Sequence, residues 1–202
     1  MPKTKKKNAH VWERDPNDWY VEPTWVWERF FARERFEGVI RDPSAGMGNC
    51  VNAARSAGYT VEARDLIARF PIIEQEEDFL QSSDEVDNIC TNPPFKLCNE
   101  EPYPYIRHGL RLARRKFAIV MQASWVFGEE RSHFLESLPL YRIYNVTPKP
   151  SMPPGAMIVA GHKPNSGAID YVIAVFLQGY DGEPSHRWLR KGGRKQPRLA
   201  GF

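Results

Sequence analysis

The sequence predicts a single α/β domain with a mostly parallel sheet and helices on both of its faces. Short apolar runs alternate with amphipathic stretches through the middle of the chain, which is typical of successive strand and helix units. The apolar run 38–41 leads into a glycine-containing turn, and the run 86–90 leads into a Thr-Asn-Pro-Pro-Phe segment. Ligands bind beyond the carboxyl ends of strands in such sheets, so these two segments are candidates for a functional site.

Each element is expected from a local pattern. Strands are expected where β-branched and aromatic residues cluster, as in FAIVM and YVIAVFL, namely at 38–41, 60–63, 86–91, 116–122, 142–146 and 171–177. Helices are expected where apolar residues recur at three- and four-residue spacing, namely at 24–36, 50–57, 105–114 and 129–138. The stretch 147–168 has five prolines and little periodicity, so we expect a functional or mobile loop there.

Composition limits the class of protein. The 202 residues are 42% hydrophobic and 26% charged, which is typical of a soluble globular domain. No apolar stretch approaches the length of a membrane span, and no apolar segment follows the basic N-terminus, so we expect no membrane segment, no signal peptide and a cytoplasmic protein. The three cysteines form no C-x-x-C pair and are expected to be reduced, mostly buried thiols, not a disulfide framework or a zinc site.

Positive charge is concentrated at the two ends. Residues 1–10 and 184–202 hold ten of the 28 basic residues and no acidic one, which leaves 18 basic against 25 acidic residues between them. We therefore expect a basic arm at 1–18, a catalytic or binding domain at 19–189 and a basic tail at 190–202. Such arms add salt-sensitive affinity for a phosphate backbone, although terminal basic runs also serve as solubilising ends.

The glycine turn reads Asp42-Pro43-Ser44-Ala45-Gly46-Met47-Gly48-Asn49. Glycines let the backbone approach a ligand, but the segment matches neither the dinucleotide pattern G-x-G-x-x-G nor the phosphate-binding G-x-x-x-x-G-K, and a purely structural turn is the alternative. Asp65 follows the second expected strand, where an acid can bind both hydroxyls of a ribose, and Glu62 competes for that role from within the strand. Asp78 and Phe79 precede the third expected strand and are candidates for binding an adenine amino group.

The Thr-Asn-Pro-Pro-Phe segment suits the binding of a planar amine. Two consecutive prolines fix φ and remove backbone donors, so they hold the strand end rigid. The side-chain oxygen of Asn92 and the carbonyl of Pro93 can then accept hydrogen bonds from one amino group, while Phe95 offers a flat stacking face. These bonds would favour attack by an aromatic amine on a methyl donor, with no need for a metal.

Together these motifs resemble the S-adenosylmethionine-dependent amino-group methyltransferases of nucleic acids, and most closely the short adenine-specific DNA methylases of phages and prophages. The resemblance covers 19–189 and includes the segments DWYVEP, PKPSMPPG and Trp188-Leu189. It implies a Rossmann-like class I methyltransferase fold with a seven-stranded sheet, S-adenosylmethionine as cofactor, DNA as partner and a bacterial or phage-infected host cell. The implied catalytic residues are Asn92, Pro93, Pro94 and Phe95, and the implied cofactor-binding residues are Thr24, Asp42, Pro43, Ser44, Gly46, Gly48, Asn49, Asp65, Asp78 and Phe79.

The chain departs from this family's pattern in two places. Before the first helix the family often has a Thr-Pro pair that contacts the carboxylate of the cofactor. This chain has Glu22-Pro23-Thr24 there, which leaves Thr24 as the candidate for that contact. The late loop lacks the aromatic that stacks on a flipped base, so Phe95 has to supply the stacking, with His162 or Trp125 as its helper.

No segment of the size of a recognition domain is left over. Target choice then falls to the 147–168 loop, the tails, a homodimer or a partner subunit, with Met152-Pro153-Pro154 acting either as a wedge or as a cap over the cofactor. Two other interpretations stay open: methylation of cytosine N4, RNA or a protein glutamine, and a non-catalytic nucleic-acid-binding subunit.

Overall fold

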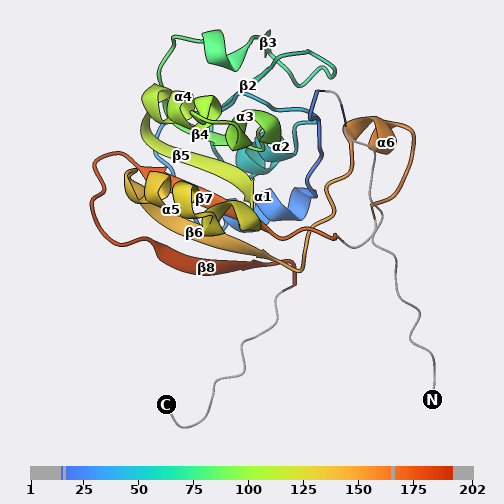
Figure 1. The fold of residues 1–202 in the computed structure, drawn as a ribbon. Coiled ribbons are helices and arrows are strands. Elements are labelled where there is room, and N and C mark those ends of the chain that lie inside the picture. Colours follow the sequence, from blue (N-terminus) through green and yellow to red (C-terminus); the bar gives the residue numbers. More distant parts are fainter. Residues whose placement is uncertain (1–14, 16, 165–166, 193–202) are drawn as a thin grey trace, which may run out of the picture.

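The computed structural model describes residues 15, 17–164 and 167–192, which form one sheet between two layers of helices (Figure 1). The strands are β1 (Ile40–Asp42), β2 (Val61–Asp65), β3 (Gln75–Glu76), β4 (Val86–Thr91), β5 (Ala113–Gln122), β6 (Leu140–Thr147), β7 (Tyr171–Leu177) and β8 (Ser185–Arg190). Their order is β3-β2-β1-β4-β5-β7-β6-β8. β7 is antiparallel to β5 and β6, and the other neighbours are parallel. The predicted α/β fold with a mostly parallel sheet is confirmed, with eight strands in the described residues where seven were expected.

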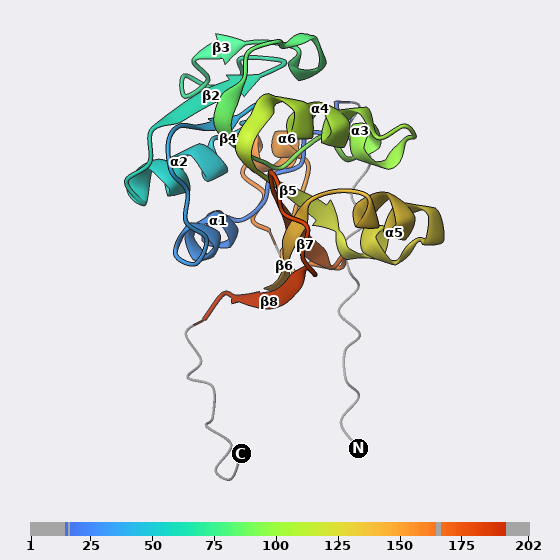
Figure 2. The same cartoon turned by 90° about the vertical axis from the view of Figure 1, so that its left-hand side faces the viewer.

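Helices cover both faces of the sheet. They are α1 (Thr24–Phe31), α2 (Asn49–Ser56), α3 (Phe95–Asn99), α4 (Pro104–Leu112), α5 (Glu129–Glu136) and α6 (Gly155–Val159), with 3₁₀ turns η1 (Phe79–Gln81) and η2 (Ala123–Phe127). Figure 2 shows the sheet with α1 and α2 on one side and α3, α4 and α5 on the other. Among these described helices none is long and apolar enough to cross a membrane.

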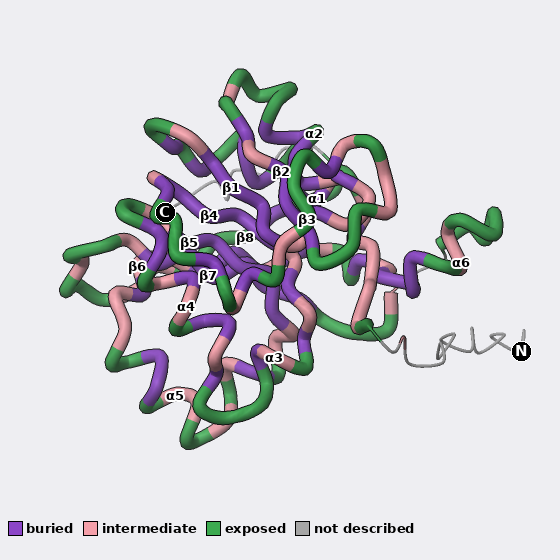
Figure 3. Tube along the Cα trace, turned by 90° about the horizontal axis from the view of Figure 1, so that it is seen from above, coloured by how far each residue is buried: buried purple, intermediate pink, exposed green. Residues whose placement is uncertain are grey.

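The central strands are buried on both faces, which explains their continuous apolar sequences. Every residue of β7 from Tyr171 to Phe176 is buried, and its side chains divide between two core clusters. One cluster includes Trp27, Phe30 and Phe31 of α1, and the other includes Ile106 and Leu112 of α4. Figure 3 shows this buried centre, with α6 set apart from the sheet.

Several element boundaries differ from those expected. The first helix was expected to reach residue 36 but ends at Phe31, because the chain bends there and brings Phe36 back into the aromatic cluster of Phe30 and Phe31. β2 extends two residues beyond the predicted 63, so Asp65 is its last residue and not a residue beyond it. The 147–168 loop contains the short helix α6, and Trp188-Leu189 lies in an additional strand, β8.

The strand order reverses between β1 and β4. From β1 the chain continues outward through β2 and β3, whereas β4 returns to the other side of β1 and leads to β5. Such a switch leaves a crevice at the carboxyl ends of the two central strands. Asp42 ends β1 and Asn92 directly follows β4, so the two motifs singled out in the sequence meet at this crevice.

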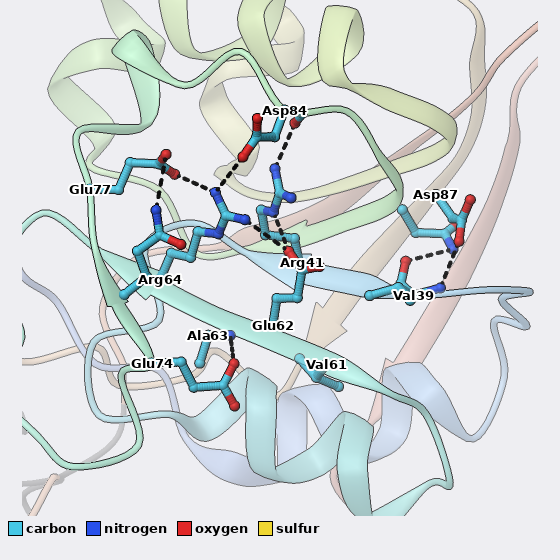
Figure 4. A network of polar contacts seen from close by, with 12 residues as sticks. Val39, Arg41, Val61, Glu62, Ala63, Arg64, Glu74, Glu77, Asp84 and Asp87 are labelled. Atoms are coloured by element: carbon cyan, nitrogen blue, oxygen red, sulfur yellow. Dashed lines mark hydrogen bonds and ion pairs between the residues drawn. The ribbon is translucent and has the colours of Figure 1, made fainter.

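An ion-pair network beside the crevice holds its outer wall (Figure 4). The Glu62 carboxylate accepts hydrogen bonds from Arg41 Nε at 2.7 Å and from Arg64 at 3.3 Å. Arg64 also donates to Glu77 at 2.9 Å, next to Asp78. Glu62 therefore joins β1 to β2 along the sheet, and Arg64 fixes the segment that carries Asp78.

A second, buried network ties the segment after α1 to β5 and β6. Glu34, of which 2% is exposed, accepts hydrogen bonds from Lys116 Nζ at 2.5 Å, Arg142 at 2.6 Å and Tyr144 Oη at 2.8 Å. The two cations are themselves largely buried, with side-chain exposures of 17% and 11%. This carboxylate is thus the shared counter-charge for two cations that have left water.

Glu34→Ala is expected to lower the free energy of unfolding by about 3–5 kcal/mol, because it leaves two buried cations without their partner. Urea denaturation followed by circular dichroism measures this loss. Glu37→Ala is the matched control: Glu37 pairs with Arg115 at the surface, and its loss is expected to change stability by less than about 1 kcal/mol. Equal effects of the two variants would contradict the interpretation.

Candidate active site

A cavity of about 270 Å³ lies at the crevice between β1 and β4. A smaller hollow of about 20 Å³ adjoins it and shares Trp19, Tyr20, Ser44 and Asn92 with it. Among the residues predicted from sequence, Pro43, Ser44, Asp65, Asp78, Phe79, Asn92 and Pro94 line the cavity, and Gly46 and Asn49 line the hollow. The structure therefore brings most of the predicted residues to one place, although they come from four separate segments of the chain.

Asn92 lines the cavity and the hollow, and it carries an acceptor without a partner among the described residues. Its amide nitrogen, Nδ2, donates to the carbonyl of Tyr20 at 2.9 Å and to Glu22 Oε2 at 2.7 Å. Its oxygen, Oδ1, is buried and has no hydrogen-bond partner among the described residues. Since a buried polar atom is normally paired, an unpaired acceptor on a cavity wall indicates a place for a donor from a ligand.

The glycine turn is fixed by hydrogen bonds to the segments around it. Gly46 N donates to Asp65 Oδ2 at 2.8 Å, and the Ser44 hydroxyl lies 2.7 Å from the Tyr105 hydroxyl. Asn49 Nδ2 donates to the carbonyl of Glu22 at 2.7 Å. Gly48 caps α2 with φ of +82°, and a side chain there would collide with Ile72, so this position requires glycine. The turn thus holds a defined shape against the hollow.

Two of the predicted acids reach the cavity. Asp65 Oδ1 accepts hydrogen bonds from Ile67 N at 3.0 Å and Arg69 at 3.4 Å, while Oδ2 binds Gly46 N, which leaves lone pairs for a ligand. Asp78 is exposed, and its Oδ1 caps η1 through Leu80 N at 3.0 Å. Carboxylates at two points of one wall suit a ligand with hydroxyl and amino donors.

Glu22 and Asp42 are buried acids behind this wall. Burial raises the pKa of Glu22 to about 6, although hydrogen bonds from its own backbone, Asn92 and Trp27 oppose the shift. Burial, reinforced by the charge of Glu22, also raises the pKa of Asp42 well above its usual range. Asp42 does not line the cavity, and its Oδ1 accepts a hydrogen bond from Ser44 N at 3.2 Å. Asp42 therefore supports the turn through this hydrogen bond and does not itself reach the cavity.

Several predicted residues lie away from the cavity wall. Thr24 is exposed on α1, and Pro93 is buried behind Asn92. The Phe95 ring is 7% exposed and packs against Tyr20 and Tyr171, at centroid distances of 6.3 and 5.8 Å. Neither of its suggested helpers lines the cavity: Trp125 is buried against Tyr103 and Phe134, and His162 is exposed. Tyr20, whose carbonyl accepts a hydrogen bond from Asn92, does line the cavity.

The late loop is attached to the segment before α1. Val21 N donates to the carbonyl of Pro153, and Gly155 N donates to the carbonyl of Trp19, both at 2.9 Å. Trp19 lines the cavity and the hollow, and Arg69 lies 4.7 Å above its ring. The segment DWYVEP is part of the family resemblance, but the sequence does not predict a role for Trp19, Tyr20 or Glu22. Their contacts join segments that are far apart in the chain.

The three cysteines are buried, as predicted. Cys50, Cys90 and Cys98 are free and buried, and burial raises the pKa of each thiol. Within the part of the chain that the structure describes, no group of His, Cys, Asp and Glu side chains has a metal-binding arrangement. Most of the basic residues of the predicted arm and tail lie outside the described residues.

Solved structures with a similar fold identify the architecture. A proposed RNA methyltransferase from Pyrococcus horikoshii is 16% identical, with a TM-score of 0.57 over 84% of this chain and 92% of that one. The M protein of the type I restriction enzyme EcoKI is 12% identical, with a TM-score of 0.56 over 87% and 49%. A proposed class I S-adenosylmethionine-dependent methyltransferase from Listeria monocytogenes is 14% identical, with a TM-score of 0.53 over 83% and 64%.

The chain has the Rossmann-like fold of class I S-adenosylmethionine-dependent methyltransferases. It spans about half of the EcoKI M protein and just under two thirds of the Listeria protein. No protein-family model matches the sequence, and no curated protein matches it. The likeness therefore establishes the fold, and the activity has to be argued from the cavity.

Gly155→Ala is expected to displace Trp19 from the cavity wall, because a Cβ atom at this position would lie 2.1 Å from the Trp19 ring. Overpacking of this kind lowers the free energy of unfolding by about 1–3 kcal/mol. Thermal unfolding measures the loss. Gly192→Ala is the matched control, since a Cβ atom there meets nothing within 4 Å, and its stability is expected to equal that of the wild type. An unchanged stability of Gly155→Ala would show that the packing of Trp19 against Gly155 is not tight.

Proposed function

We propose that this chain transfers a methyl group from S-adenosylmethionine to the exocyclic amino group of adenine in DNA. The observation that carries the proposal is the unpaired, buried Oδ1 of Asn92, a residue that lines a cavity at the switch point of a methyltransferase fold. An oxygen in this place accepts a hydrogen bond from an amine and draws its nitrogen toward a methyl donor held in the same cavity.

The residues of the cavity fit this cofactor. Asp65 is assigned to the ribose hydroxyls and Asp78 to the adenine amino group, while Phe79, Leu80 and Leu97 supply apolar wall for the purine. The indole nitrogen of Trp19 is buried without a partner among the described residues, which makes it a donor for a ligand carboxylate in place of Thr24. The glycine turn, with Ser44, Gly46 and Asn49, is assigned to the methionine part.

The chemistry needs orientation and charge stabilisation from the protein. When bound, S-adenosylmethionine supplies an electrophilic sulfonium methyl group. The Asn92 oxygen is assigned to an N–H group of the target, where it stabilises the positive charge that develops on nitrogen. The nitrogen lone pair forms the new bond to carbon, the carbon–sulfur bond breaks with its electron pair left on sulfur, and one proton passes to water.

Adenine has to leave the DNA duplex to reach this oxygen. A base inside the helix is inaccessible, so the nucleotide is flipped out and stacked in the site. In this proposal Tyr20 and Phe95 form the stacking surface together: Tyr20 lines the cavity beside Asn92, and Phe95 supports its ring from the core. The EcoKI M protein, a modification-enzyme subunit, shares the fold and supports DNA as the acceptor.

RNA is the second candidate acceptor. The Pyrococcus protein is described as a proposed RNA methyltransferase, and this chain spans 92% of it. Labelled-methyl transfer from S-adenosylmethionine to DNA, RNA and total protein in parallel separates the acceptors. We expect incorporation into DNA, released as methylated adenine on hydrolysis. Incorporation into RNA or protein alone would contradict the proposed substrate, and none at all would contradict the proposed activity.

Asn92→Ala is expected to lower kcat for methyl transfer by roughly 10²–10³-fold, because it removes an acceptor that acts in the transition state. Its affinity for S-adenosylmethionine, measured by calorimetry, is expected to stay within a few fold of the wild type. Asn99→Ala, at the exposed end of α3, is the matched control and is expected to keep full activity. Undiminished transfer by Asn92→Ala would rule out the assigned role.

Asp65→Ala is expected to weaken binding of S-adenosylmethionine by roughly 10- to 100-fold, the range for hydrogen bonds to a charged group. Calorimetry measures the affinity, and circular dichroism confirms that the domain stays folded. Asp170→Ala, which removes an exposed carboxylate paired with Lys149, serves as the control and is expected to bind normally. If the affinity of Asp65→Ala equals that of the control, the ribose lies elsewhere.

A further inference from the structure

Glu22 connects α1 and the strand end that carries Asn92. It is 7% exposed, and each of its carboxylate oxygens accepts a hydrogen bond from another side chain. Oε1 accepts from the indole nitrogen of Trp27 at 2.6 Å, and Oε2 accepts from Asn92 Nδ2 at 2.7 Å. Two donors thus face two acceptors, an arrangement that an ionised carboxylate satisfies in full.

The same contacts decide which way the Asn92 amide points. Both hydrogens of Nδ2 are used, one by Glu22 and one by the carbonyl of Tyr20. A rotated amide would place its oxygen against that carboxylate and that carbonyl, so acceptors would face acceptors. Only the observed orientation leaves Oδ1 unpaired on the cavity wall.

We propose that Glu22 is a positioning residue for methyl transfer: its ionised carboxylate locks the amide of Asn92 with the oxygen toward the target amine. This role rests on the proposed function, since it concerns the group that binds the target. Glu22 lines the hollow, but its two carboxylate oxygens are bonded to Trp27 and Asn92, and it acts through the direction in which Asn92 points. A misdirected acceptor at a reacting centre lowers rates by up to about 100-fold.

The charge of Glu22 makes the lock sensitive to pH. Protonation turns one of its oxygens into a donor, which then opposes the N–H group of Asn92 or of Trp27. The titratable groups against Glu22 are Asp42 at the end of β1 and the thiol of Cys50 in α2, and burial raises the pKa of both. The pKa of Glu22 is itself raised to about 6, so the lock is complete above this pH and is lost as the pH falls through it.

The test compares the wild type with Glu22→Gln, Asn92→Asp and the double variant, using kcat for DNA methylation and calorimetric affinity for S-adenosylmethionine. Glu22→Gln offers one acceptor to two donors, so kcat is expected to fall roughly 10- to 100-fold with cofactor affinity unchanged. Asn92→Asp alone sets two carboxylates against each other and is expected to be at least as impaired. In the double variant the introduced amide can donate to the introduced carboxylate and still accept from Trp27, so kcat is expected to recover at least tenfold over Asn92→Asp.

The control is Glu34→Gln, an equally buried glutamate that contacts Lys116 and Arg142 and not Asn92. Its kcat is expected to equal that of the wild type. A second measurement needs no variant: the wild-type kcat is expected to fall about tenfold per pH unit below pH 6, as Glu22 gains a proton.

The outcomes separate the two proposals. Wild-type kcat in Glu22→Gln, no recovery in the double variant, or a flat pH profile from pH 7 to 4.5 would each overturn the role of Glu22 and leave the methyltransferase assignment standing. A wild-type chain that transfers no methyl group to DNA, RNA or protein overturns the proposed function and this role with it.

Discussion

The hydrogen bond from Asn92 Nδ2 to Glu22 Oε2 is the contact on which the candidate site depends. It joins the end of β4 to the segment before α1 and fixes an amide that would otherwise present either end to the cavity. The Tyr20 carbonyl adds a second constraint on the same nitrogen. What remains on Asn92 is a buried oxygen without a partner among the described residues. This acceptor determines where a donor group of a ligand can bind.

The surrounding fold holds the two segments that make this contact in place. β1 and β4 are neighbours at the switch point, so the glycine turn and the proline-rich strand end meet at one edge of the sheet. Asp65 reaches across to the turn through Gly46 N, while the late loop binds the Trp19 segment through Pro153 and Gly155. The ion pairs of Glu62 and Arg64 beside these segments add to the rigidity that an orientation-dependent reaction requires.

Much of this architecture could be predicted from local sequence patterns. YVIAVFL and FAIVM identify central strands because they are buried on both faces, and the Asn-Pro-Pro-Phe segment marks an unusual strand end. Contacts between distant segments could not be predicted: Glu22 and Asn92 are 70 positions apart, and nothing local to either indicates a bond between them. The position of Phe95 in the core has the same origin, since Tyr20 and Tyr171 cover its ring. β8 was missed because its one fully buried residue, Leu189, lies among residues that are mostly exposed.

The account's central claim is that Asn92 directs a methyl group onto adenine in DNA. Mass spectrometry of nucleosides from the DNA of cells that express the chain, in a host without its own adenine methylation, tests it most directly. The account predicts N6-methyladenine in cells with the wild-type chain and none in cells with Asn92→Ala at equal expression. DNA that carries only unmodified adenine, or a methyl group on cytosine alone, would contradict it.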